Sequence, residues 1–201
     1  MTDNIVFIYP SIAIIGYILG SIPFGLLLTK FFIGTDVRDI GSGNIGATNV
    51  LRTGNKFLAM LTLLLDAFKG YLSIIIIEYY FNSNLALIAG FFTFLGHLYP
   101  VWLNFKGGKG VATYFGILFA IAPFIALLFT IIWIITLAIS CYSSLSALLA
   151  TLFAPIPFLL LQTNIISIMF IVMTLLIYLR HKDNIIRLAR GEEKKSFHNK
   201  I

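Results

Sequence analysis

Charged side chains are scarce in this chain of 201 residues. Asp, Glu, Lys and Arg together make up 11% of it, whereas hydrophobic residues make up 59% and the mean hydropathy is +0.98. A soluble domain carries about 25% charged residues, so the composition excludes an ordinary soluble protein and predicts a polytopic membrane protein. About seven apolar crossings would leave little length for loops, and we expect no separate domain outside the membrane.

Cysteine and histidine are also rare. The single cysteine, Cys141, excludes an internal disulfide and says nothing about the redox compartment. The three histidines and this cysteine lack the spacing of metal ligands, so we predict neither a metal nor a cofactor. The segment Met1–Pro10 lacks the basic and small-residue signals of a cleaved leader, and we expect the first apolar run to be retained as a span.

The apolar runs predict an all-α protein with about seven transmembrane helices. They form one integral membrane domain over residues 1–201, with polar motif segments near residues 41–56, 96–113 and 181–193. The expected spans cover residues 6–29, 57–77, 85–103, 111–122, 124–140, 145–161 and 164–179. The fourth run is short and ends at Pro123, a residue type that interrupts helices.

The basic residues lie on one side of this arrangement. Of the 14 Lys and Arg, all but Lys69 fall next to the three motif segments or in the tail, and the opposite loops near Glu78, Pro123 and Gln162 contain none. By the positive-inside rule, the motifs and the C-terminus face the cytoplasm and the N-terminus lies outside. This topology explains the net charge of +6 without a nucleic acid partner. It also brings the three motifs into one compartment, as a single active site requires.

The first motif is the glycine-rich polar stretch Gly41–Arg52, set in a nearly hydrocarbon sequence. Gly41–Gly46 fits the dinucleotide pattern G-x-G-x-x-G, but the membrane spans on either side exclude the βαβ unit that this pattern needs. A turn without a ligand would explain the glycines but not the polar residues that accompany them. These are Asn44, Thr48, Asn49 and Arg52. We therefore interpret the stretch as an anion cradle that opens a helix N-terminus.

The second motif runs from Gly96 to Thr113 and contains Gly-Gly-Lys-Gly at Gly107–Gly110. Its glycines would expose backbone donors beside Lys109, while the missing Ser or Thr after this lysine excludes a Walker A loop. Lys106 fits an anchor at the membrane interface as well as a ligand. His97, near a span end, fits a satisfied interior histidine as well as a functional one.

The third motif is His181–Glu193. Read as a helix, it brings Asn184, Arg187 and Gly191 onto neighbouring turns. Standing alone, it would fit a basic amphipathic tail on anionic lipid at least as well as part of a site.

Two charged residues also lie inside the second span, Asp66 and Lys69, three positions apart. Charges within a membrane are costly, so the pair either marks a function or consists of two groups that neutralise each other.

Together, the three motifs closely resemble those of the bacterial membrane family of acyl-phosphate:glycerol-3-phosphate acyltransferases. The first match is Gly-Ser-Gly-Asn-x-Gly-Ala-Thr-Asn-x-x-Arg at Gly41–Arg52. The second is Gly-His-x-Tyr-Pro-Val-Trp, then Phe-Lys-Gly-Gly-Lys-Gly-Val-Ala-Thr up to Thr113. The third is His-x-x-Asn-Ile-x-Arg-Leu-x-x-Gly-x-Glu at His181–Glu193. Tyr99 and Trp102 stand where the family pattern has phenylalanine, and both keep an aromatic ring.

The resemblance implies a reaction at the bacterial inner membrane, the first step of phospholipid synthesis. A fatty acyl group moves from acyl phosphate to the 1-hydroxyl of sn-glycerol 3-phosphate, giving lysophosphatidic acid and inorganic phosphate. The implied partners are these two substrates and membrane lipid. The rival hypothesis is a membrane transporter of phosphate esters or phospholipid. It would need polar residues along a path through both leaflets, and the last three spans offer few.

The site residues follow from the same match. Those expected to act in catalysis are Ser42, Arg52, Lys109, His181 and Asn184. Those expected to bind substrate or phosphate are Gly41, Gly43, Asn44, Thr48, Asn49, His97, Gly107, Gly108, Gly110, Thr113, Arg187 and Glu193.

Each motif has an expected role. Arg52 and Lys109, with the loop amides, hold phosphate, and the other polar side chains of the first motif orient the glycerol hydroxyls or the acyl carbonyl. The third motif closes the site, with Glu193 bracing its basic residues. Either His97 or a substrate phosphate oxygen takes the hydroxyl proton, and similarity to a substrate-assisted reaction favours the phosphate.

Overall fold

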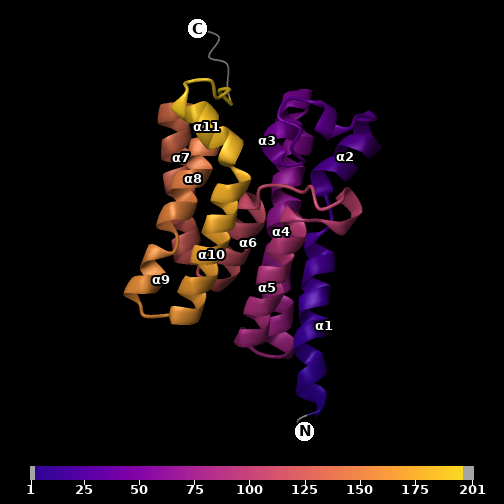
Figure 1. The fold of residues 1–201 in the computed structure, drawn as a ribbon, viewed down its shortest axis with the longest axis vertical. Coiled ribbons are helices and arrows are strands. Elements are labelled where there is room, and N and C mark those ends of the chain that lie inside the picture. The colour runs from indigo at the N-terminus through magenta and orange to yellow at the C-terminus, as the bar shows by residue number, and fades with distance from the viewer. Residues whose placement is uncertain (1–2, 197–201) are drawn as a thin grey trace. The chain divides into compact units, whose positions relative to one another are not determined.

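The structure is a computed structural model that describes residues 3–196 (Figure 1). Residues 1–2 and 197–201 lie outside the described part, and with them Lys200 of the predicted basic tail. Residues 3–196 form helices and turns and no strand, which confirms the predicted all-α class. Two compact units divide the chain between Ile121 and Ala122. The single functional domain remains a prediction.

The first unit is built around its longest helix. Its α-helices are α1 (Asp3–Gly20), α2 (Phe24–Ile33), α3 (Ala47–Val50), α4 (Lys56–Tyr80), α5 (Ser83–Leu98) and α6 (Val111–Ile121). Its 3-10 turns are η1 (Val37–Asp39), η2 (Leu51–Thr53) and η3 (Val101–Leu103). The 25-residue α4 contacts all five other α-helices of the unit. It starts where Asn55 Oδ1 accepts a hydrogen bond from Leu58 N at 3.0 Å, as an N-cap residue does.

Glycines set the closest helix contacts in this unit. α1 packs on α5 with Gly16 and Gly20 against the backbone of Ala89 and Thr93, where a Cβ on either glycine would collide with a carbonyl oxygen. Thr93 Oγ1 also donates a hydrogen bond to Gly16 O at 3.0 Å. Small residues spaced in this way let apolar helices approach closely inside a membrane. α6 approaches α4 in the same manner at Gly116.

The second unit contains five helices. They are α7 (Pro123–Ser140), α8 (Ser143–Phe153), α9 (Ile156–Leu160), α10 (Asn164–Arg180) and α11 (Lys182–Ala189). Pro123 occupies the first turn of α7, where its missing N–H costs nothing, so the predicted break after the fourth run is confirmed. The sixth predicted span is interrupted as well, because Pro155 separates α8 from α9.

Helix length supports most of the predicted spans. Five apolar segments of the described chain are long enough to cross a membrane, or six if the bent pair α10 and α11 forms one span. The first of them joins α1 and α2, which the sequence analysis treated as one helix and which separate at Pro23. The fourth predicted span is the 11-residue α6, about 16 Å long against a hydrocarbon core of about 30 Å. The count of seven therefore exceeds what length alone supports.

Candidate active site

The first motif is a loop folded around the side chain of Asn49, which is only 2% exposed. Its Nδ2 lies 2.7–2.9 Å from three loop carbonyl oxygens, those of Val37, Ile40 and Asn44. Its Oδ1 accepts from Ser42 N at 3.0 Å. The Asn49 side-chain amide thus supplies hydrogen bonds to backbone groups that do not pair with one another in this irregular loop. Asn49 therefore shapes the loop, and its predicted role in orienting substrate stays a prediction.

The loop amides are largely occupied. Gly43 N donates to Ile40 O, and Gly46 N donates to Asn44 Oδ1 at 2.9 Å. The helix that follows, α3, has only four residues and then tightens into η2. The anion cradle predicted at a helix N-terminus therefore cannot draw on the amides of Ser42, Gly43 and Gly46. The exposed side chains of Ser42, Thr48 and Arg52 are the groups that the loop presents.

Gly41 makes room for Arg52. It has φ = +57°, and a Cβ there would lie 2.7 Å from Arg52 Cδ and 2.6 Å from Asn49 Oδ1. The guanidinium Nη1 lies 3.4 Å from Asn49 Oδ1. The positive φ and the close approach both require glycine, so Gly41 lets Arg52 cross the loop beside Ser42.

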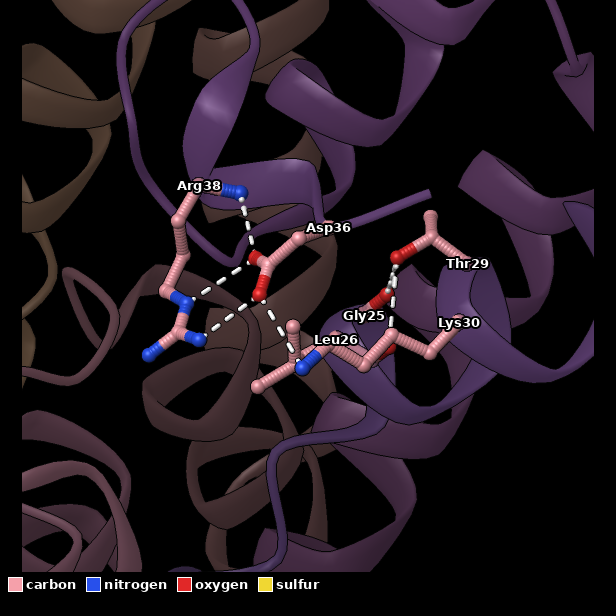
Figure 2. A network of polar contacts seen from close by, with 6 residues as sticks. All are labelled: Gly25, Leu26, Thr29, Lys30, Asp36 and Arg38. Carbon is pink, nitrogen blue, oxygen red and sulfur yellow. Dashed lines mark hydrogen bonds and ion pairs between the residues drawn. The ribbon is translucent and has the colours of Figure 1, made fainter. Parts of the chain in front are cut away.

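An ion-pair network fixes the start of this loop (Figure 2). Asp36 caps η1 by accepting from Arg38 N, and its carboxylate binds the Arg38 guanidinium through two further bonds of 2.9 and 2.7 Å. Lys30 Nζ, from the last turn of α2, lies 3.1 Å from Asp36 Oδ2. The hydrogen bonds from Arg38 hold the pKa of the Asp36 carboxyl well below its usual range. The network ties α2 to the segment that enters the motif.

The first and second motifs share one apolar core. Six buried side chains form it beneath the first loop: Leu26, Val37, Ile45, Val50, Leu58 and Ala59. Leu103, from η3 of the second motif, packs against this group. Both motifs therefore rest on the same half of α4, as the shared-site prediction requires of them.

The glycines of the second motif serve close packing. Gly107 N donates to Leu98 O at 3.1 Å and Gly108 N to His97 O at 3.0 Å, so both amides already have backbone partners. The predicted phosphate binding by Gly107 and Gly108 stays a prediction. A Cβ on Gly108 would overlap His97 Nε2, and one on Gly107 would overlap His97 O. Lys109 follows directly and is half-buried. Gly110, with φ = +87°, turns the chain into α6.

Beneath this loop lies a buried charged cluster of Asp66, Lys69 and His97, each no more than 4% exposed. Lys69 Nζ lies 2.8 Å from Asp66 Oδ1, 3.0 Å from His97 Nδ1 and 2.9 Å from Ile22 O. Thr113, predicted to bind substrate, is buried, and its Oγ1 donates to Asp66 O at 3.0 Å. The two span charges do neutralise each other. Their link to His97 had no sequence signal beyond their being charged within a span.

The third motif lies in the second unit and closes on Glu193. The Glu193 carboxylate accepts from Ser144 Oγ at 2.7 Å, from Asn184 Nδ2 at 2.6 Å and from Arg187 Nε at 2.7 Å. Burial raises the pKa of Glu193, but these three donors outweigh it and hold the pKa below its usual value. The predicted bracing of a basic residue by Glu193 is therefore present. Ser144 is a partner that the sequence analysis missed.

The third motif forms the predicted helix only up to Ala189, so Gly191 lies beyond its end rather than on one of its turns. α11 ends at Ala189, and Gly191 has φ = +71° while Glu192 N donates to Arg187 O and Gly191 N to Leu188 O. This pair of bonds is the Schellman ending of a helix. His181 is buried at the bend before α11, with Nδ1 2.8 Å from Ile177 O. Among residues 3–196, no group of three or more His, Cys, Asp or Glu is arranged to hold a metal ion.

Comparison with known proteins identifies the family. The sequence profile described as glycerol-3-phosphate acyltransferase matches residues 11–191. The glycerol-3-phosphate acyltransferase of Rhizobium etli is 53% identical over 183 residues, covering 91% of this chain and 89% of the relative. That of Pelagibacter ubique is 52% identical over 188 residues, covering 94% and 97%. The chain belongs to the glycerol-3-phosphate acyltransferase family.

Two solved structures of this family share the fold. PlsY (YgiH), described as an integral membrane glycerol 3-phosphate acyltransferase, matches in its glycerol 3-phosphate form with a TM-score of 0.88 at 39% identity, over 93% of this chain and 94% of that one. Its lysophosphatidic acid form matches with a TM-score of 0.85 at 37% identity over the same shares. These findings confirm the family resemblance read from the three motifs. From these matches we conclude that this chain is an integral membrane protein of the glycerol-3-phosphate acyltransferase family.

Proposed function

We propose that this chain transfers a fatty acyl group from acyl phosphate to the 1-hydroxyl of sn-glycerol 3-phosphate. The observation that carries the proposal is the match over 93% of the chain to the glycerol 3-phosphate form of PlsY and to its lysophosphatidic acid form. These would be a substrate and the product of the proposed reaction. The acyl-phosphate donor comes from the resemblance of the three motifs.

The proposed chemistry needs no protein nucleophile. The 1-hydroxyl oxygen attacks the acyl carbonyl carbon, the bond from that carbon to the phosphate oxygen breaks, and inorganic phosphate leaves. The hydroxyl proton goes to a phosphate oxygen. Because acyl phosphate is a mixed anhydride with a good leaving group, positioning and charge neutralisation can supply most of the acceleration.

Arg52 and Lys109 are the proposed phosphate-binding cations. Arg52 lies exposed on the glycine-lined first loop, against Gly41. The same loop exposes the Ser42 and Thr48 side chains, which would orient the glycerol hydroxyls or the acyl carbonyl. A guanidinium can grip two phosphate oxygens at once. Asn44 and Asn49 support this arrangement through the loop rather than through the substrate.

His97 is a poor general base in this geometry. His97 Nδ1 lies 3.0 Å from Lys69 Nζ and 3.5 Å from Asp66 Oδ1, so this nitrogen is already engaged by the buried ion pair. The ring is 4% exposed and its Nε2 edge packs against Gly108, which leaves little access for a substrate hydroxyl. This supports the phosphate oxygen as proton acceptor. Activity of a His97→Gln variant that keeps the wild-type pH profile would agree with it.

The third motif is included in the proposal because its sequence matches the family pattern. His181 and Asn184 are proposed catalytic residues, with Arg187 and Glu193 supporting substrate binding. The internal geometry fits such a use, since Glu193 fixes the Asn184 and Arg187 side chains in one arrangement. We further propose that the motifs face the cytoplasm across the bacterial inner membrane, as the distribution of basic residues indicates.

Purified chain in detergent or bilayers tests the function directly. It is incubated with radiolabelled glycerol 3-phosphate and either palmitoyl phosphate or palmitoyl coenzyme A. We expect lysophosphatidic acid and one equivalent of inorganic phosphate with palmitoyl phosphate only. Product from the thioester alone would overturn the proposed donor. Absence of product with both donors would overturn the proposed acyl transfer and favour the transporter hypothesis.

A further inference from the structure

The cluster of Asp66, Lys69 and His97 has no task in the proposed reaction, yet it joins four parts of the first unit. Asp66 and Lys69 stand on α4, and His97 stands near the end of α5. Lys69 also reaches Ile22 O in the break between α1 and α2, where its Nζ lies 5.6 Å from the centroid of the Phe24 ring. Gly108 of the second motif rests on the His97 ring.

Three neighbours hold the Lys69 ammonium in place. It donates to Ile22 O at 2.9 Å, lies 3.0 Å from His97 Nδ1 and forms an ion pair with Asp66 Oδ1 at 2.8 Å. Each of these neighbours lies on a different helix or break, so the ammonium fixes their separation. Since the group is 2% exposed, water cannot replace a lost partner cheaply. The contacts of His97 Nδ1 with Lys69 Nζ and, at 3.5 Å, with Asp66 Oδ1 hold the imidazole ring in place.

His97 links the buried cluster to the second motif by two contacts. Its carbonyl oxygen accepts from Gly108 N at 3.0 Å, and its ring leaves no space for a side chain at position 108. Thr113, after the motif, is held to the same turn of α4 by its bond to Asp66 O. The backbone on both sides of Lys109 is therefore tied to the residues that carry the buried charges.

We propose that Asp66, Lys69 and His97 are positioning residues that set the place of the Lys109 ammonium, and through it the affinity for the phosphate of glycerol 3-phosphate. The inference rests on the proposed function, because it takes Lys109 as a phosphate ligand. It gives the cluster a role beyond the mutual neutralisation of two charges. None of the three side chains touches substrate in this account.

The deciding variant removes both charges at once. Replacing a buried ion pair by apolar residues of similar volume often leaves stability unchanged, whereas removing one partner strands the other. Asp66→Leu/Lys69→Met should therefore stay folded, with a thermal unfolding midpoint near that of the wild type, while His97 loses the donor that orients it. Calorimetry should show weaker glycerol 3-phosphate binding, and kcat/KM should fall about 10- to 100-fold. Lys56→Met, an exposed lysine on the same helix, is the matched control and should change neither.

A second measurement separates positioning from general damage. In the Lys109→Ala background, the double replacement should add no further loss of glycerol 3-phosphate affinity, because the cluster would act through a group already removed. Additive losses in this cycle would overturn the proposal. So would a folded double variant whose affinity and kcat/KM stay within about twofold of the wild type.

A substitute variant and the wild-type chain complete the test. If Asp66→Leu/Lys69→Met did not fold, Lys69→Arg would take its place, because it keeps the charge but displaces the imidazole with a larger fork. Weakened binding by a folded Arg variant supports the cluster, and wild-type binding overturns it. An inactive wild-type chain that does not bind glycerol 3-phosphate would overturn the proposed function itself. An active wild type with unaffected variants overturns only the cluster.

Discussion

Arg52 and Lys109 are the two residues on which the proposed phosphate binding depends most. Truncating either leaves a phosphate charge without its partner in a partly apolar site. We expect Arg52→Ala and Lys109→Ala to abolish measurable turnover, a loss of at least about 10³-fold in kcat/KM. Lys106→Ala, on the same loop but exposed, should cost less than about 10-fold. Initial rates with palmitoyl phosphate measure this, and equal losses at both lysines would contradict the separation of their roles.

Gly108 tests whether packing on His97 matters. Gly108→Ala introduces a Cβ that would overlap the imidazole, so the loop must shift. We expect kcat/KM to fall at least about 10-fold. Gly34→Ala is the control for a glycine replacement without steric overlap, because Gly34 has open space around it, although its φ of +63°, unlike that of Gly108, strains an alanine. It should lower the free energy of unfolding by about 1 kcal/mol without changing the kinetics. A Gly108 variant with wild-type kinetics would show that the contact is adaptable.

At the scale of elements, the segment after α11 is attached to the turn between α7 and α8. Ser196 N donates to Cys141 O at 2.8 Å, Ser143 N donates to Ser196 Oγ at 3.1 Å, and Ser144 Oγ donates to Glu193. Cys141 adopts φ = +63°, which turns its carbonyl toward the tail. Glu193 also accepts from Asn184 Nδ2 and Arg187 Nε, so the order of the third motif depends on its carboxylate.

This attachment should depend on pH with a definite sign. The pKa of Glu193 is lower in the folded protein than its ordinary value of 4.5, so its ionisation stabilises the attached tail above that pH. The stabilisation is lost as the pH falls below 4.5 through the folded-state pKa. We expect the protection of the Ser196 amide, measured as its exchange rate relative to that of an unfolded amide at the same pH, to fall in that window. Glu193→Gln should show fast exchange already at pH 7, and slow exchange in this variant would contradict the role of the charge.

At the scale of the whole molecule, orientation is the property that the basic residues predict. Lys56 and Tyr80 mark the two ends of α4, and both are exposed. With the native cysteine removed by Cys141→Ser, an impermeant thiol reagent added to intact cells should label a Tyr80→Cys variant. A Lys56→Cys variant should react only after the membrane is opened. The reverse pattern would show that the motifs face outward.

The sequence by itself determined the membrane class, the three motifs and the family. These depend on composition and on short patterns of neighbouring residues, which a linear reading contains in full. Tertiary structure alone decided which groups the motifs leave available. Asn49 fills its loop by reaching carbonyls up to 12 positions away, and Lys69 meets His97 across 28 positions.

Contacts between residues this far apart in the sequence form only when the chain folds, so no local sequence pattern predicts them. The glycines illustrate the difference. Their spacing predicted exposed amides for phosphate, but the packed loops use those amides internally and need the glycines for close approach to Arg52 and His97. The sequence shows which residue stands at each position. Only the folded structure shows the neighbours that make that residue necessary there.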